Sequence, residues 1–546
     1  MNNTLRKNSF SKFFGSLGHW VSGAPILVLL SAALLILAYP QTNLWLLSWI
    51  GLVPLMTVID ARSPLKAFGC GYLCGVIFFA ATLYWFIYVT TLGAVLLVLY
   101  LSLYFGCFAF GYALVRERSF WIRLIFVPSL WVVLEYIRGH FLTGFGWVNL
   151  GHSQQHCLPV IQMAELTGVY GISFLLVLVN FVIRQGVRFW TEKTDEAREH
   201  FLQGAAVTAV ALAVVIVFGV FRLAVFDRAG REWQVAVIQP DVAQEMKWSR
   251  SAWPRTMEHL LALTKEAAKG KPDIIIWPET SLPGYVWEAP ELLEELKDYA
   301  ARLEIPMVIG LVTRPQEDVY YNSAILLSAE GKITEQYNKL HLVPFGEYIP
   351  LRGMFPFLEE IVPIADFTAG DQATVFSAPS VEINGRHKSF SMLICFEDTI
   401  ARVTRKFARA GAELLVNITN DAWFADTKAP YLHLQSAVFR AVENRRFLVR
   451  AANTGVSCFI NAAGRVTGYA HDSRGKRTFV PAVAQQAVDF HARPTFYTLY
   501  GDVFAWLCFG TVLVAGILEP TAHPARPAAL RRKPRAGEEQ SDAGSR

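Results

Sequence analysis

Three short segments of the chain each end on a residue that could take part in acyl chemistry. They are Ile274-Ile275-Ile276-Trp277-Pro278-Glu279, Tyr337-Asn338-Lys339 and Met392-Leu393-Ile394-Cys395. A thiol is a poor nucleophile and a thiolate is a good one, so Cys395 needs a group that removes its proton. The carboxylate of Glu279 could do this, and the ammonium of Lys339 could favour the thiolate and then stabilise the oxyanion of a tetrahedral intermediate. Together the three residue types predict nucleophilic catalysis at Cys395.

The same three segments have the pattern of strand ends. Each closes an apolar run typical of a buried strand, and Pro278 ends its strand because proline has no N–H for the ladder. In open α/β sheets, ligands lie against the loops at the carboxyl ends of the strands. We therefore expect these loops to bring Glu279, Lys339 and Cys395 together. The backbone N–H of Phe396, which follows the nucleophile, is a natural second donor to the oxyanion.

Residues 226–495 have the pattern of an α/β domain. Short apolar runs predict strands at Gln234–Ile238, Asp273–Trp277, Pro306–Leu311, Ser323–Leu327, Ser391–Cys395, Glu413–Ile418 and Gly455–Asn461. Intervening stretches predict helices at Trp253–Ala268, Pro290–Leu303 and Leu432–Phe447. Strands that alternate with helices indicate a buried sheet, and about 270 residues is ample for an independent core.

The remainder of the chain is strongly apolar. Hydrophobic residues make up 53% of the 546 residues and charged residues only 17%, whereas soluble proteins contain about 25% charged residues. Runs long enough to cross a bilayer as helices occur at 25–39, 43–59, 67–90, 92–114, 120–137, 168–183, 204–224 and 502–518. We therefore expect eight transmembrane helices, seven before the α/β domain and one after it. The net charge of +5 is small for this length and does not suggest nucleic-acid binding.

The charges of the loops predict the orientation of these helices. Lys and Arg are concentrated in the N-terminus and in every second loop, which is the pattern of cytoplasmic segments. The α/β domain is then expected on the opposite side of the membrane. The predicted organisation is a cytoplasmic N-terminus (1–24), a seven-helix transmembrane domain (25–225), the α/β domain (226–495), an eighth transmembrane helix (496–519) and a disordered cytoplasmic tail (520–546).

The three chemical motifs jointly resemble the nitrilase, or carbon–nitrogen hydrolase, superfamily. That resemblance implies Glu279 as general base, Lys339 as oxyanion stabiliser and Cys395 as nucleophile. It also implies an αββα sandwich for residues 226–495.

The whole chain resembles the apolipoprotein N-acyltransferase family, which completes bacterial lipoprotein maturation. Val343-Pro344-Phe345-Gly346-Glu347-Tyr348 and Cys395-Phe396-Glu397 fit that family and imply supporting roles for Glu347 and Glu397. Trp248 fits a functional tryptophan of a mobile loop, and Arg138 and Trp147 lie in a segment similar to the family's membrane-proximal segment. Phe396 stands where tyrosine is expected more often. This difference argues against a role for a side-chain hydroxyl at this position, but not against a role for the backbone amide.

The resemblance implies a ping-pong reaction in the bacterial inner membrane, with the catalytic domain on the periplasmic side. A phospholipid would donate its acyl group to Cys395 as a thioester, and the α-amine of a diacylglyceryl-modified apolipoprotein would accept it. The family is usually monomeric. The sequence has no metal-ligand cluster and no nucleotide-binding glycine motif, so neither a metal nor a cofactor is expected.

Other roles remain open for several of these residues. Glu347 could cap a turn, and Glu397 could pair with an arginine. Trp248 could anchor the chain at the membrane interface. Arg138 could pair with Glu135 or bind a lipid phosphate.

Three further features favour structural roles or leave the role open. His341 is expected to be structural, and Cys458 is expected to be part of the core. The polar stretch from Asn417 to Trp423 could line the site or only form loop hydrogen bonds.

Two rival functions differ in class from an acyltransferase. The first is a membrane-anchored nitrilase-type amidase that hydrolyses a C–N bond, in which water resolves the thioester. Eight helices argue against it, because a single helix would suffice as an anchor. The second is a transporter or structural membrane protein with a degenerate outer domain, which predicts charges within the spans and tolerance of Cys395→Ala.

Overall fold

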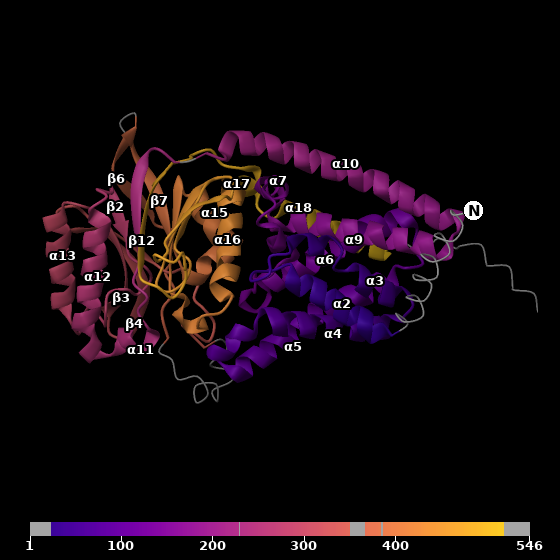
Figure 1. Cartoon of the computed structure of the whole chain (residues 1–546), viewed down its shortest axis with the longest axis horizontal. Helices are drawn as coiled ribbons and strands as arrows, with labels where there is room; N and C mark the ends of the chain where they lie inside the picture. Colours follow the sequence, from indigo (N-terminus) through magenta and orange to yellow (C-terminus); the bar gives the residue numbers. More distant parts are fainter. Residues whose placement is uncertain (1–22, 229, 350–365, 384–385, 518–546) are drawn as a thin grey trace, which may run out of the picture.

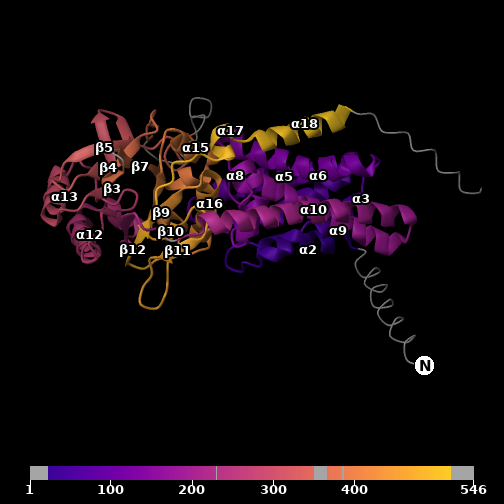
Figure 2. The same cartoon turned by 90° about the horizontal axis from the view of Figure 1, so that it is seen from above.

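The computed structural model describes residues 23–228, 230–349, 366–383 and 386–517 of the chain. These residues form two parts that lie end to end, a bundle of helices and an α/β sandwich (Figure 1). The last helix returns from the sandwich and lies along the bundle (Figure 2). The predicted N-terminal segment, up to residue 22, and the predicted tail lie outside the described residues.

The helical part is built from apolar helices joined by short 3₁₀ turns. Its α-helices are α2 (Ala24–Leu37), α3 (Val53–Asp60), α4 (Pro64–Thr82), α5 (Thr91–Leu114), α6 (Phe120–His140), α7 (Leu158–Ile161), α8 (Ala164–Thr167), α9 (Val169–Glu192), α10 (Asp195–Phe226), α17 (Phe496–Tyr500) and α18 (Val503–Ile517). Its 3₁₀ helices are η1 (Trp45–Trp49), η2 (Tyr84–Tyr88), η3 (Phe141–Thr143) and η4 (Leu150–Gln154).

Among the described residues, five helices are long and apolar enough to cross a membrane, namely α4, α5, α6 (extended to Thr143), α9 and α10. The predicted runs at the start and end of the chain form shorter helices, α2 and α18. The run predicted at 43–59 is broken into η1 and α3, where Pro54 occupies the first turn of the new helix. The run predicted at 67–90 ends as α4 at Thr82 and continues as η2.

Helix α10 has a different environment from the other long helices. It contains 32 residues, which corresponds to a length of about 48 Å. Thr194 accepts a hydrogen bond from the Ala197 N–H at its start, and two acidic residues of its first turn complement the helix dipole. Only 6% of its most apolar stretch is buried, and both views show it along the outside of the bundle (Figures 1 and 2).

The α/β part contains two six-stranded sheets. The first has the order β12-β1-β2-β3-β4-β5 and the second has the order β11-β10-β9-β8-β7-β6. The strands are β1 (Trp233–Gln239), β2 (Ile274–Ile276), β3 (Met307–Gln316), β4 (Val319–Leu327), β5 (Ile333–Asn338), β6 (Val375–Ile383), β7 (Arg386–Ile394), β8 (Leu414–Thr419), β9 (Phe447–Ala452), β10 (Cys458–Ile460), β11 (Val466–Tyr469) and β12 (Ala482–Val488). In each sheet three central strands are parallel (β1, β2 and β3; β7, β8 and β9) and the outer pairs are antiparallel.

The two sheets pack face to face, and helices cover their outer faces. Apolar side chains of both sheets share one core, which includes Val235 and Met392. Helices α12 (Trp253–Ala268) and α13 (Pro290–Leu303) cover the first sheet, and α15 (Ala401–Arg409) and α16 (Ala429–Asn444) cover the second (Figure 1). The short helix α11 (Gln244–Trp248) follows β1. The predicted αββα sandwich is therefore the observed fold of this part.

The sequence predicted part of this element list well. The helices at Trp253–Ala268 and Pro290–Leu303 have their predicted bounds, and the seven predicted strands are present with shifted ends. The helix predicted to reach Phe447 is wrong at its end. Arg445 adopts a left-handed conformation with φ of 51°, which ends α16, and Phe447 begins β9.

The helical part and the sandwich share a continuous apolar core. Side chains of the bundle and of α16 belong to one cluster of buried residues, which also includes Leu415 and Leu448 of the second sheet. Helix α16 lies at the junction of the two parts (Figure 1). The second sheet is therefore held rigidly against the helices, and this sheet carries Cys395.

Candidate active site

Glu279, Lys339 and Glu347 meet at one edge of the first sheet. Glu279 follows β2, Lys339 follows β5, and Glu347 lies in the turn beyond Lys339. The Lys339 ammonium lies 2.9 Å from the Glu347 carboxylate and 3.6 Å from Oε1 of Glu279. All three side chains are buried. The predicted grouping of Glu279 with Lys339 is therefore present, and Glu347 is part of it.

Asn322 of β4 connects the two carboxylates and was not identified from the sequence. Its amide donates hydrogen bonds of 2.8 Å to Oε1 of Glu279 and of 2.8 Å to Oε1 of Glu347. Its backbone carbonyl accepts the backbone N–H of Lys339 at 2.9 Å. An asparagine in an apolar strand gives no sequence signal, because its role depends on the neighbouring strands.

Cys395 occupies a sharp turn between β7 and the 3₁₀ helix η6 (Cys395–Thr399). Its φ is 54°, a left-handed conformation that costs a residue with a Cβ about 1–3 kcal/mol. The turn places the thiol at the strand end and makes Phe396 the second residue of η6. The first N–H groups of a helix have no acceptor within it, so the Phe396 N–H is suited to receive an oxyanion.

The electrostatics of the site oppose a resting thiolate. Burial and the Glu279 carboxylate raise the pKa of the Cys395 thiol, and the Lys339 ammonium lowers it. Burial alone would lower the pKa of Lys339, but the carboxylates of Glu347 and Glu279 raise it well above its usual value. Lys339 is therefore a permanent cation, and Cys395 is held as a thiol.

Glu397 joins the cysteine turn to the lysine loop. Its carboxylate accepts the N–H groups of Ile394 at 2.7 Å, Leu340 at 2.8 Å and His341 at 3.0 Å, and the hydroxyl of Tyr337 at 2.7 Å. Burial raises its pKa to about 7, although these hydrogen bonds oppose the shift. Glu397 therefore links the end of β7 in the second sheet to the loop after β5 in the first sheet. Its partners are backbone groups and a tyrosine, so the predicted alternative of an arginine partner is not what the structure has.

The side chain of Phe396 faces the helical part. Its ring stacks with Trp147 at 6.4 Å and with His341 at 6.0 Å between centroids. Trp147 is buried and also packs against Trp85 at 5.0 Å. A phenylalanine at this position is thus explained by packing between the two parts of the molecule.

Behind the nucleophile lies a buried group of four charged residues, Asp398, Asp421, His433 and Arg450. The His433 ring lies 2.8 Å from Asp398 and 2.9 Å from Asp421, and Arg450 contacts both aspartates. Burial and Arg450 lower the pKa of His433, but the two aspartates raise it above its usual value. With His433 protonated, the group is neutral.

This charged group reaches Cys395 through Asn417. Arg450 donates to the Asn417 carbonyl oxygen at 2.7 Å, and the Asn417 amide donates to the backbone carbonyl of Cys395 at 3.2 Å. The His433 ring also packs on Trp147 at 5.1 Å. Asn417 and Asp421, which the sequence left open, therefore lie beside the nucleophile, while His433 and Arg450 were missed because they are distant in the chain.

The predicted substrate-contact residues lie in different surroundings. Arg138 is buried and donates to the backbone carbonyl of Trp147 at 3.1 Å and to the side-chain oxygen of Asn149, so it bonds to protein groups. Trp248 is 39% exposed and packs on Tyr285 at 5.2 Å. Cys458 is fully buried, and all seven cysteines are free, which agrees with its predicted core position.

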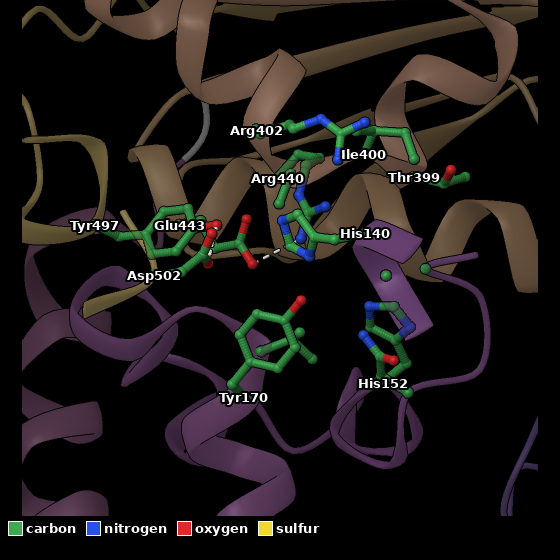
Figure 3. A pocket seen from close by; sticks show the side chains of 15 residues that line it. His140, His152, Tyr170, Thr399, Ile400, Arg402, Arg440, Glu443, Tyr497 and Asp502 are labelled. Carbon is green, nitrogen blue, oxygen red and sulfur yellow. Dashed lines mark hydrogen bonds and ion pairs between the residues drawn. The ribbon is translucent and has the colours of Figure 1, made fainter. Parts of the chain in front are cut away.

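A polar cavity lies at the junction of the two parts. Figure 3 shows His140, His152 and Tyr170 from the helical part facing Arg402 and Arg440 from the sandwich. Dashed lines mark the Arg440–Glu443 contact of 2.6 Å and the Tyr497–Asp502 hydrogen bond of 3.0 Å. Neither Cys395 nor its catalytic partners line this cavity.

Two protein families match the two parts of the chain. Residues 31–182 match the apolipoprotein N-acyltransferase N-terminal domain, and residues 234–490 match the carbon-nitrogen hydrolase family. The apolipoprotein N-acyltransferase of Geobacter metallireducens is 37% identical over 90% of this chain and 94% of its own length. Those of Methylococcus capsulatus (31% identical, 91% of this chain, 95% of the relative) and Chlorobaculum tepidum (28% identical, 92% of this chain, 97% of the relative) are similar over comparable lengths. This chain, with both of its parts, belongs to the apolipoprotein N-acyltransferase family.

Proposed function

We propose that this protein transfers a fatty acyl group from a membrane phospholipid to the N-terminal α-amine of diacylglyceryl-modified apolipoproteins, through a thioester on Cys395. The observation that carries the proposal is the meeting of Glu279, Lys339 and Glu347 in the sandwich that presents Cys395. The continuous core between that sandwich and a bundle of membrane-length helices supports a lipid as acyl donor.

The first half-reaction forms the thioester. Glu279 takes the proton of the Cys395 thiol, and the thiolate attacks the ester carbonyl of the phospholipid. The Lys339 ammonium and the Phe396 N–H stabilise the tetrahedral oxyanion. The C–O bond then breaks, Glu279 returns its proton to the departing oxygen, and a lysophospholipid leaves.

The second half-reaction forms the amide. The neutral α-amine of the apolipoprotein attacks the thioester carbonyl, and Glu279 takes the proton of the attacking nitrogen. The C–S bond breaks, and the thiolate of Cys395 recovers a proton from Glu279. Glu347 and Asn322 hold Lys339 and Glu279 in place through both half-reactions.

The orientation in the membrane is part of the same proposal. The basic loops support cytoplasmic termini; with seven spans before the sandwich and one after it, the sandwich faces the periplasm at the bacterial inner membrane. Arg138 and Trp147 act at the junction of the two parts, where Arg138 holds the loop that carries Trp147. Trp248, exposed next to the site, contacts substrate. The protein acts as a monomer without a metal or cofactor.

The decisive experiment is mass spectrometry of the purified protein after incubation with phospholipid. We expect the mass of one acyl chain on the peptide that contains Cys395, and its release when a diacylglyceryl peptide is added. Cys395→Ser should carry no turnover-competent adduct, and Cys458→Ser serves as the matched control in a buried strand. Free fatty acid without N-acylated peptide would instead establish the hydrolase alternative, and a fully active Cys395→Ala would exclude an enzyme of this kind.

A further inference from the structure

Lys247 is a buried lysine that the reaction described above does not use. It lies in α11, next to Trp248, and is 4% exposed. Its ammonium donates to the backbone carbonyl of Glu279 at 3.2 Å. Among the residues that the structure describes, no carboxylate lies within ion-pair distance of it. Lysines are almost never fully buried unless they are paired, so a retained, unpaired ammonium in this place needs a physical reason.

Three hydrogen bonds hold the short helix that carries Lys247. The backbone carbonyl of Lys247 accepts the Trp253 indole N–H at 3.1 Å and the Gly284 N–H at 3.3 Å. Gln244, at the start of α11, accepts a hydrogen bond of 2.7 Å from Asn420, which follows β8 in the second sheet. Helix α11 is therefore tied to α12, to the loop after β2 and to the loop after β8, and the ammonium itself is held by the Glu279 carbonyl.

The charge balance of the site gives the reason. Glu279 and Glu347 contribute two negative charges, and Lys339 contributes one positive charge. The four charged residues behind the nucleophile balance one another. When the Cys395 proton moves to Glu279, this net negative charge stays in the buried site and shifts onto the thiolate, at a large electrostatic cost. The Lys247 ammonium, which lies 3.2 Å from the Glu279 backbone carbonyl, supplies the missing positive charge, and the charges of Glu279 and Cys395 in turn raise its pKa.

We propose that Lys247 is a positioning and charge-balancing residue of the active site, which holds the backbone of the base Glu279 and stabilises the Cys395 thiolate. The inference rests on the proposed role of Cys395 as a nucleophile. The proposal makes α11 part of the site through the buried side chain of Lys247. The neighbouring Trp248 is 39% exposed.

The first test is the alkylation rate of Cys395 by iodoacetamide, followed on the Cys395 peptide by mass spectrometry. Lys247→Met should slow this rate at least tenfold at pH 7, because one pKa unit of the thiol corresponds to a factor of ten in thiolate. Lys247→Arg should keep most of the rate. Lys269→Met is the matched control, because Lys269 has a side chain that is 70% exposed. An unchanged rate in folded Lys247→Met would overturn the proposal.

A structural role would give a different pattern. Lys247→Met removes a buried charge without changing the side-chain length much, so we expect its unfolding temperature within about 4 °C of the parent protein. A strongly lowered unfolding temperature, with normal alkylation in the protein that remains folded, would show that Lys247 only supports the fold.

The pH profile provides an independent readout. Burial lowers the pKa of Lys247 to about 8, opposed by the charges of Glu279 and Cys395. Acyl-enzyme formation should therefore decline as the pH rises through about 8, and Lys247→Arg should abolish that decline. The charged groups that face Lys247 and Cys395 from the neighbouring elements are Glu279, Glu347, Glu397, Lys339 and Asp421. Arg450 and His433 lie behind Asp421. An identical decline in Lys247→Arg would contradict the assignment.

Failure of the proposed function can be told apart from failure of this inference. Iodoacetamide reacts with the thiol whether or not the protein accepts a phospholipid. A protein without acyl transfer, but with slow alkylation in Lys247→Met, would refute the proposed function alone.

Discussion

At the scale of single residues, the site depends on groups that hold the catalytic side chains as much as on those side chains themselves. Asn322 is the clearest case, because its one amide group serves the carboxylates of both Glu279 and Glu347. These two like charges would otherwise repel each other and share only Lys339. An amide with two donors is the neutral group that can satisfy both carboxylates at once.

We expect Asn322→Leu to reduce acyl-enzyme formation about 100-fold. The substitution removes one hydrogen-bond donor from each of two buried carboxylates, at a cost of about 1–3 kcal/mol for each. Rapid-mixing measurement of thioester formation on Cys395 checks this. Ser323→Ala is the control, because Ser323 bonds to Thr313 and Asn338 on the opposite face of β4. Equal losses in both variants would point to a general defect of the strand.

At the scale of elements, the end of β7 and the loop after β8 are fixed by the buried charges of Asp398, Asp421, His433 and Arg450. Such a group is costly to assemble, and removing one member leaves an uncompensated charge. Its link to Cys395 through Asn417 means that the conformation of the nucleophile depends on α16, the helix that carries His433.

The stability of the protein should depend on pH through His433. Burial opposes its charge, but Asp398 and Asp421 raise its pKa in the folded state. Its contribution is therefore complete below the unfolded value of about 6.5 and is lost as the pH rises through the raised folded value. Thermal unfolding in detergent should show this decline.

His433→Gln should remove about 3–5 kcal/mol of stability at pH 6 and flatten the decline above it. His471→Gln is the control, because His471 is exposed on a turn. A His433→Gln protein that keeps the parent's pH dependence would show that another group is responsible.

At the scale of the whole molecule, buried polar contacts join the helical part to the sandwich. Glu165 of α8 binds Arg222 of α10 at 2.7 Å and also contacts Arg445, which ends α16. Gln162 donates to the carbonyl of Ala463 at 2.9 Å. These contacts therefore tie α8 and the segment before it to α10 and to the sandwich.

We expect Glu165→Leu to destabilise the protein by about 3–5 kcal/mol, because it leaves the Arg445 guanidinium buried without its carboxylate. The expected readouts are a lower unfolding temperature and faster cleavage by a protease at the junction. Glu192→Gln, which removes the exposed pair with Arg188, should change stability by only about 0–1 kcal/mol. Similar effects of both substitutions would mean that the junction does not depend on Glu165.

The sequence alone predicted the features that depend on local pattern and chemistry. Hydrophobic periodicity located the apolar helices and the helices α12 and α13, and three strand ends identified Glu279, Lys339 and Cys395. The strand and helix predictions are confirmed because burial imposes a composition on each element. The roles of the three residues stay a prediction that rests on the residue types that acyl chemistry requires. The family resemblance added Glu347 and Glu397. In the structure Glu347 contacts Lys339, and Glu397 contacts the loop that follows Lys339.

Only the tertiary structure brought in the remaining groups. Asn322, Lys247, His433 and Arg450 act through partners that lie far away in the chain, so no local pattern marks them. A buried polar residue must find its hydrogen-bond partner wherever the packing of the sheets brings one. The left-handed conformation of Arg445 ends α16. In the apolar run at 43–59, a new helix starts with Pro54 in its first turn.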